Sequence, residues 1–170
     1  MSALTRAQTY FVDEDECIAL VGPVMVVVAR KEPSTDITRQ ADVCVSALER
    51  KYHGNSALLV IVKSDVRPPS DEGRERIRGA MKACERSMRV GAIVVEGQGF
   101  IATATRSAIT MMLFVVRTNF PVKVFSVVDD AAEHICSALM AHDLTPSGLL
   151  QAIRDLRTAY DAGSLRGSHR

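Results

Sequence analysis

The chain has 170 residues, of which 47% are hydrophobic and 24% charged, a composition typical of a globular protein with one core. Its formal net charge of +1 gives no global electrostatic reason to expect a nucleic-acid partner. Residues 1–8 lack the apolar core of a signal peptide, and the longest uncharged apolar runs, residues 17–29 and 108–116, fall short of the ~20 residues that a membrane span needs. We therefore expect a cytoplasmic protein without a membrane span or a nucleic-acid partner.

The chain opens with β-prone segments. Residues 9–12 and 17–21 flank an acidic turn at residues 13–16, which predicts an antiparallel hairpin. Gly22-Pro23 then interrupts a further β-prone run at residues 24–29. This run is either a continuation of the second strand past a bulge at Gly22 or a third short strand, and we favour the bulged continuation.

A helix and a central strand follow. Residues 33–36 have the composition of a helix start, and Gly54 ends the helix. Its apolar positions recur at spacings of three and four: Ile37, Ala41, Cys44, Leu48 and Tyr52. Residues 57–62 form a continuous apolar run of strand length without alternation, which predicts a central parallel strand.

The second helix begins after Ser70. Its apolar side contains Ile77, Ala80, Met81, Cys84 and Met88. The opposite side is a mostly basic stripe of Arg74, Arg78, Lys82 and Arg89, together with Glu85. Such a stripe is usually a solvated face, and its alternative role is to dock a protein partner.

Residues 91–95 form a short buried strand, Gly97-Gln98-Gly99 breaks it, and residues 100–118 have helical periodicity. The apolar positions of this helix are Phe100, Ala104, Ala108, Met111, Met112, Val115 and Val116, and we expect it to be largely buried. Pro121 follows the end of the helix, and residues 122–128 return as a strand. The result is a βαβ unit with parallel strands and a right-handed crossover.

The glycine turn has two interpretations. It satisfies G-x-G-x-x-[GA] between a strand and a helix, as in dinucleotide-binding proteins, with Asp129 as the ribose-binding acid. Asp129 lies further along than the usual ~20 residues, however, and too little chain follows for the second half of such a fold. The alternative is a simple turn whose helix N-terminus binds a small anion. The ligand or anion-binding candidates are Gly97, Gln98, Gly99, Phe100 and Arg106.

Two helices end the chain. Asp129-Asp130 caps the first, which ends near His142 and turns Ala131, Ile135, Ala138 and Leu139 inward. Thr145-Pro146 starts an additional helix whose apolar stripe consists of Leu149, Ile153, Leu156 and Tyr160. We interpret this stripe as a contact in a homodimer or higher assembly, and docking onto the chain's own domain is the competing explanation. Residues 164–170 are polar and expected to be disordered.

No arrangement of residues predicts a catalytic or metal site. The chain has no P-loop, nucleophile elbow or HExxH motif. Its cysteines, Cys17, Cys44, Cys84 and Cys136, are scattered without a C-x-x-C pair, which favours reduced core thiols. His134 and Cys136 stand two apart on a helix and point to different faces, so they cannot share a metal. We expect no catalytic residue, metal or cofactor.

Residues 94–139 have a familiar pattern. The segments Gly97-Gln98-Gly99-Phe100, Pro121-Val122-Lys123-Val124-Phe125 and Asp130-Ala131-Ala132-Glu133-His134-Ile135, with Arg106 in an alanine-rich helix, carry it. The pattern resembles the anti-sigma-factor-antagonist-like (SpoIIAA-like) branch of the STAS superfamily, which is often compared with CRAL-TRIO-type lipid-binding domains. The resemblance covers roughly residues 9–141.

The STAS resemblance implies a regulatory phosphoacceptor in the loop that enters the second helix. In this chain the equivalent stretch is Ser70-Asp71-Glu72-Gly73, a partial match to the usual Asp-Ser-Ser-Gly-like context. Ser70 is therefore the phosphosite candidate. The competing interpretation, which we favour, is that Ser70 is a helix N-cap, because Asp71 and Glu72 would repel a phosphate.

Together these patterns predict an α/β fold in which a mixed sheet opens with an antiparallel hairpin and continues with parallel strands. Residues 9–141 form the STAS-like domain and residues 145–161 an added helix. The resemblance implies a non-enzymatic regulatory or protein-interaction module of a bacterial cytoplasmic pathway. An alternative is a binding protein for an apolar small molecule or lipid, with Phe100, Met111, Met112, Phe114 and Phe120 as candidate walls. A nucleotide-binding protein that uses the glycine turn is a third hypothesis.

Overall fold

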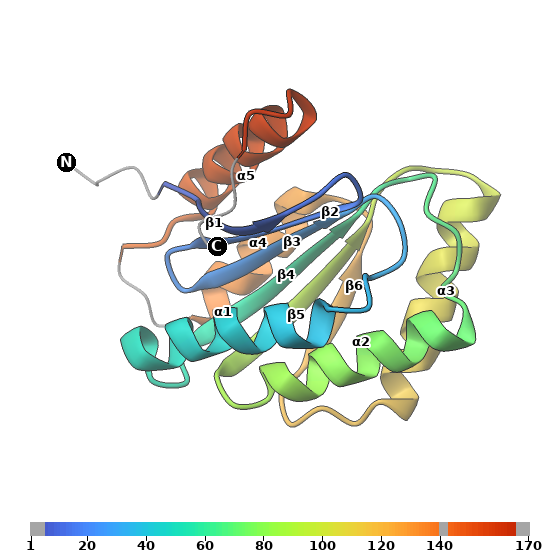
Figure 1. Cartoon of the computed structure of the whole chain (residues 1–170), viewed down its shortest axis with the longest axis horizontal. Coiled ribbons are helices and arrows are strands. Elements are labelled where there is room, and N and C mark those ends of the chain that lie inside the picture. Colours follow the sequence, from blue (N-terminus) through green and yellow to red (C-terminus); the bar gives the residue numbers. More distant parts are fainter. Residues whose placement is uncertain (1–5, 140–142, 166–170) are drawn as a thin grey trace.

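A mixed β-sheet forms the centre of the protein (Figure 1). The computed structural model describes residues 6–139 and 143–165. Within them the sheet has six strands: β1 (Gln8–Val12), β2 (Glu16–Val21), β3 (Val24–Ala29), β4 (Ser56–Val62), β5 (Met88–Val95) and β6 (Val122–Phe125). Their order in the sheet is their order in the chain; β1, β2 and β3 pair antiparallel, whereas β3 to β6 pair parallel. The predicted fold class is confirmed.

The segment after Gly22-Pro23 is a separate third strand, so the predicted bulged continuation is wrong. Val21 pairs with Val24, which leaves Gly22 and Pro23 as a two-residue hairpin loop. Gly22 has φ +56°. Tight hairpin loops need a positive φ at their first central position, which glycine adopts without strain.

Five helices within the described residues cover the two faces of the sheet: α1 (Ile37–Tyr52), α2 (Asp71–Cys84), α3 (Phe100–Val115), α4 (Val128–Ala138) and α5 (Pro146–Asp161). The crossover helices α1, α2 and α3 lie on one face and α4 and α5 on the other. Successive side chains of a strand point to opposite faces of the sheet. Ile18 and Leu20 pack on the face covered by α1–α3, whereas Cys17 and Ala19 pack on the face covered by α4 and α5.

The end of the chain is built into this core. In α5, Leu149, Ile153, Leu156 and Tyr160 are buried in a single chain, against α4 and the sheet. The assumption that this stripe needs a second chain is therefore wrong, and the competing explanation, docking onto the chain's own sheet, is the one observed. The physical reason is that α1, α2 and α3 all cross on one face, so that α4 alone leaves part of the other face uncovered.

Polar contacts hold α5 at the carboxyl ends of the parallel strands. Arg157 makes a two-pronged ion pair with Glu96, just after β5, at 2.6 and 2.8 Å. Asp161 accepts hydrogen bonds from Arg30 at 2.5 Å and from Lys63 at 3.2 Å, residues that follow β3 and β4. The helix is thereby joined to three neighbouring strands.

Helix ends differ slightly from the predicted ones. The Thr145 side chain caps α5 as predicted, accepting from Gly148 N–H at 3.1 Å. Helix α4 begins one residue before Asp129, so Asp129 and Asp130 lie in its first turn and favour it through the helix dipole rather than as caps. Helix α4 ends at Ala138, earlier than predicted, because the backbone of Leu139 is extended. The predicted end near His142 and residues 166–170 of the predicted disordered tail lie outside the described residues.

Candidate functional site

Helix α3 lies at the edge of the molecule (Figure 1), and the exposed side chains on its outer side form an apolar surface. Among the described residues seven large apolar side chains are exposed, and five of these lie on α3. The exposed fractions are 88% for Phe100, 46% for Ile101, 71% for Met111, 81% for Phe114 and 71% for Val115. We call these five residues the α3 stripe. Contiguous apolar surface of this kind usually marks an interaction site.

The stripe exists because α3 has apolar residues on more than one side. At 3.6 residues per turn its five members fall within about 140° of the helix circumference. The opposite side packs on β5 and β6 and buries Ala102, Thr105, Ile109 and Met112. The prediction that this helix is largely buried is wrong for its outer side, because α3 covers the end of the sheet and no described element packs on its outer side.

The glycine turn before α3 is a close packing point. Gly97 and Gly99 have φ +90° and +97°. A Cβ on Gly97 would lie 2.4 Å from the Cβ of Ser64 in the β4–α2 loop, so only glycine fits there. Gly97, Gln98 and Gly99 are exposed.

Arg106 does not complete an anion site at this turn. Its Nε donates to the carbonyl of Val95 at 3.2 Å, and its second guanidinium nitrogen donates to the carbonyl of Gly97. The guanidinium therefore holds the turn against α3. The interpretation of the glycines as a backbone turn has structural support, and the candidate cation Arg106 is engaged by two carbonyls of that turn.

The basic stripe of α2 is largely neutralised by neighbouring acids. Arg74 pairs with Asp71 at 3.4 Å, Arg78 with Glu75 at 2.8 Å and Lys82 with Glu85 at 2.6 Å. These three cations are exposed on α2, whereas Arg89 is exposed on β5. The predicted docking residues thus belong to a surface of mixed charge, and a role in docking remains a prediction.

This mixed surface continues into the C-terminal end of the α3 stripe. A polar recess between α2 and α3 is lined by Arg78, Lys82, Glu75, Glu85, Val115 and Arg117. Asn119, just beyond α3, donates to the carbonyl of Glu85 at 3.2 Å and joins the ends of the two helices. The apolar stripe therefore has a rim of paired charges on its α2 side.

Ser70 is the N-cap of α2, as favoured. Its hydroxyl accepts from Gly73 N–H at 3.1 Å and donates to Glu32 at 2.8 Å. Glu32 also accepts from the Ser70 N–H at 2.7 Å, and these two hydrogen bonds lower the pKa of its carboxyl. A phosphate on Ser70 would stand beside this carboxylate, so the local charge opposes the phosphosite interpretation.

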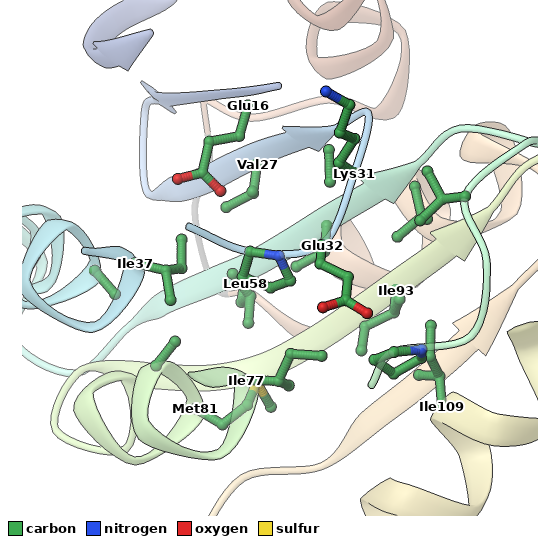
Figure 2. A pocket seen from close by; sticks show the side chains of 18 of the residues that line it. Glu16, Val27, Lys31, Glu32, Ile37, Leu58, Ile77, Met81, Ile93 and Ile109 are labelled. Atoms are coloured by element: carbon green, nitrogen blue, oxygen red, sulfur yellow. The ribbon is translucent and has the colours of Figure 1, made fainter. Parts of the chain in front are cut away.

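A second feature is an apolar cavity of about 110 Å³ on the α1–α3 side of the sheet (Figure 2). Its walls include Ile37, Leu58, Ile77, Met81, Ile93 and Ile109. The loops that follow β3 and β4 border it with Lys31, Glu32 and Arg67. It thus lies near the carboxyl ends of parallel strands, where α/β proteins commonly bind ligands.

Glu16 is a buried ionisable group at the wall of this cavity. Its side chain accepts from the Ser34 hydroxyl at 2.8 Å, and only 3% of the residue is exposed. Burial raises the pKa of this carboxyl above its ordinary value, with Asp13 and Asp15 adding to the effect. Neither Glu16 nor Glu32 was identified from sequence, because Glu16 stood among the four acids expected in the turn at residues 13–16 and the lone acid Glu32 gives no signal of a cavity.

Of the five residues predicted to form the walls of a ligand pocket, two are buried and three are exposed. Met112 lines the cavity, and Phe120 is buried against Gly91 beside β6. Phe100, Met111 and Phe114 belong to the exposed α3 stripe and cannot line the cavity. The helical spacing identified these residues as apolar but assigned three of them to the wrong side. The signal was that apolar residues extend over more of α3 than the one side that a sheet can bury.

The described residues provide no metal site or reactive thiol. No group of three or more His, Cys, Asp or Glu side chains among them could hold a metal ion. Burial raises the pKa of Cys17, Cys44 and Cys84 to about 12 and also raises the pKa of the half-buried Cys136, so none of the four is activated as a thiolate. No helix in residues 6–139 or 143–165 is long and apolar enough to cross a membrane.

Comparison with known proteins adds no relative to these observations. No protein-family model, curated protein or solved structure matches the chain.

Proposed function

We propose that this protein is a non-enzymatic, STAS-like regulatory or protein-interaction module that binds a protein through the α3 stripe. The observation that carries the proposal is the exposure of five large apolar side chains on one helix. Fully covering one such side chain gains roughly 1.5–3 kcal/mol, so the stripe stabilises a complex by several kcal/mol before the costs of association.

The surroundings of the stripe also suit a protein partner. Exposed aromatic and methionine side chains within a rim of paired charges are the usual composition of a protein interface. The predicted docking residues Arg78 and Lys82 lie on this rim. The mixed sheet with its crossover helices is compatible with the STAS resemblance, on which the regulatory part of the proposal rests.

The test is affinity capture from an extract of the source cells. The variant carries Met111→Glu and Phe114→Glu, and a matched control carries Ser147→Glu and Thr158→Glu, two exposed positions on α5. We expect proteins retained by the wild type and the control to be lost from the stripe variant, and α3 to gain protection from hydrogen exchange in the complex. Equal recovery by all three proteins would contradict the proposal.

The cavity supports a second candidate function, the binding of a small apolar molecule. Its volume of about 110 Å³ is below the ~150 Å³ of an engineered cavity that binds benzene, and far below the ~300–1,000 Å³ of pockets for larger ligands. In this conformation it suits a small ring or a short alkyl group rather than a whole lipid.

Two measurements test the second candidate. Native mass measurement of freshly purified protein would detect a retained ligand, and benzene titration followed by NMR would report binding at Ile109 and Met112. The variant Ala80→Leu, which places a larger side chain at the cavity wall, should remove the shifts. A chain that is empty when purified and unresponsive to benzene would exclude this function.

A further inference from the structure

The α3 stripe has the size that an interface between two chains needs. An aromatic side chain removes about 150–250 Å² from water when it is covered, so Phe100 and Phe114 together would remove roughly 300 Å² per chain. A stable interface removes about 800 Å² from each partner. The two rings supply more than a third of that area, and Ile101, Met111 and Val115 extend it.

The shape of the stripe is complementary to itself. Large side chains stand at its two ends, and the small residues Ala104, Ser107 and Ala108 occupy the middle of the same side of α3. If a second α3 lies antiparallel across it, with the two-fold axis at Ser107, Phe100 faces Phe114 and Val115 of the second copy. The same register sets Met111 against Ala104, large against small, and lets the two backbones approach at the axis.

Charge also favours a second copy over a different protein. Helix α3 contains no carboxylate, and its one cation, Arg106, is held by the carbonyls of Val95 and Gly97. Two copies therefore meet without like charges at the centre, and antiparallel helices place opposite ends of their dipoles together.

We propose that the α3 stripe is covered by a second copy of this chain, in a two-fold dimer with antiparallel α3 helices. This inference rests on the proposed function, since it names the protein that the stripe binds. It also gives the predicted homo-oligomer a new contact: the α5 stripe is buried within one chain, whereas the α3 stripe is exposed.

The first test is sedimentation velocity over roughly 1–100 μM, the range in which moderate dimers dissociate. We expect the wild type and the Ser147→Glu/Thr158→Glu control to reach twice the chain mass. In the Met111→Glu/Phe114→Glu variant the dissociation constant should rise by roughly thirtyfold or more, as for the loss of an interface hot spot. Circular dichroism checks that the variant folds.

The second test addresses the antiparallel register. In the Ser107→Cys variant two thiols would meet at the two-fold axis, so mild oxidation should give a covalent dimer. Thr158→Cys on α5 and the wild type should stay uncrosslinked, because Cys17, Cys44 and Cys84 are buried and the half-buried Cys136 lies on α4, on the other face of the sheet. A dimer that does not crosslink through Ser107→Cys overturns the proposed register.

The remaining outcomes separate this inference from the proposed function. A monomer throughout the concentration range, with capture of another protein that depends on Met111 and Phe114, overturns the dimer and leaves the interaction module standing. A monomer whose stripe variants lose binding to anionic lipid vesicles overturns both, because the occupant is then a membrane surface. A monomer that binds neither also overturns both.

Discussion

Helices α3 and α5 are both 16 residues long, and each has an apolar stripe, but the stripe of α5 is buried and the stripe of α3 is exposed. Helix α5 has a charged outer side, and its stripe is buried against α4 and the sheet. Helix α3 has apolar residues on both sides, so burying one side leaves the other in water. One packing partner is enough to bury the apolar side of an amphipathic helix, whereas a helix with two apolar sides at the edge of a sheet keeps one of them exposed to water.

The comparison is tested most strongly by shortening one side chain in each helix. Ile153→Ala in α5 should lower the free energy of unfolding by about 2–5 kcal/mol, because Ile153 is 2% exposed and its loss leaves a cavity. Phe114→Ala in α3 should change the stability of the isolated chain by at most about 0.5 kcal/mol. Urea unfolding at a low protein concentration measures both.

Repeating the unfolding measurements at several protein concentrations provides the control. If a second copy covers the α3 stripe, the effect of Phe114→Ala should grow as the protein concentration rises, while that of Ile153→Ala should not. Equal destabilisation by the two substitutions in dilute solution would mean that α3 is not exposed as described.

The next prediction concerns how the two helices begin. A side-chain cap from Thr145 starts α5, whereas two glycines start α3. Gly97→Ala should cost about 1–3 kcal/mol, from its positive φ and from the contact with Ser64. Gly99→Ala is the matched control, since its φ is similar but its surroundings are open. Ser64→Gly should restore part of the loss in the Gly97→Ala background and nothing in the Gly99→Ala background.

The smallest expected effect tests the ionic attachment of α5. The hydrogen bonds from Arg30 and Lys63 lower the pKa of Asp161 from its ordinary value of 3.8. A lowered carboxyl pKa stabilises the fold above the ordinary value, and this contribution is lost as the pH falls through the lower folded value. Asp161→Asn should therefore reduce stability at neutral pH by less than about 1 kcal/mol, because the carboxylate is half exposed.

The pH dependence separates this ionic effect from a simple loss of packing. The difference between Asp161→Asn and the wild type should disappear in strong acid and shrink at high salt. A difference that is the same at pH 7 and pH 2 would show that the attachment is not electrostatic.

The arrangement of strands and helices was largely predictable because its signals are local. The apolar run at residues 57–62, the Ser70 cap and the Thr145-Pro146 start each depend on a few neighbouring residues, and each appears as predicted. The turn at Gly22-Pro23 was missed because a bulge and a tight turn use the same residues, and the choice depends on pairing with a distant strand.

The candidate site was less predictable because exposure depends on what lies next to a helix. Periodicity identified Phe100, Met111 and Phe114 as apolar, but only the position of α3 at the end of the sheet leaves them outside. Likewise the basic side of α2 was visible in the sequence, while the pairing of each cation with an acid three residues away depends on side-chain conformation.

Because the strands lie in the sheet in the order in which they occur in the chain, each can pair with the one before it as the protein is synthesised. None of the six described strands waits for a later one to be inserted between it and its neighbour. The two faces differ in timing, however: α1, α2 and α3 arrive between the strands that they cover, whereas α4 and α5 follow the last strand. A nascent chain on the ribosome therefore presents the apolar face of a nearly complete sheet until α5 emerges, and that interval is when the protein is most exposed to aggregation and to chaperones.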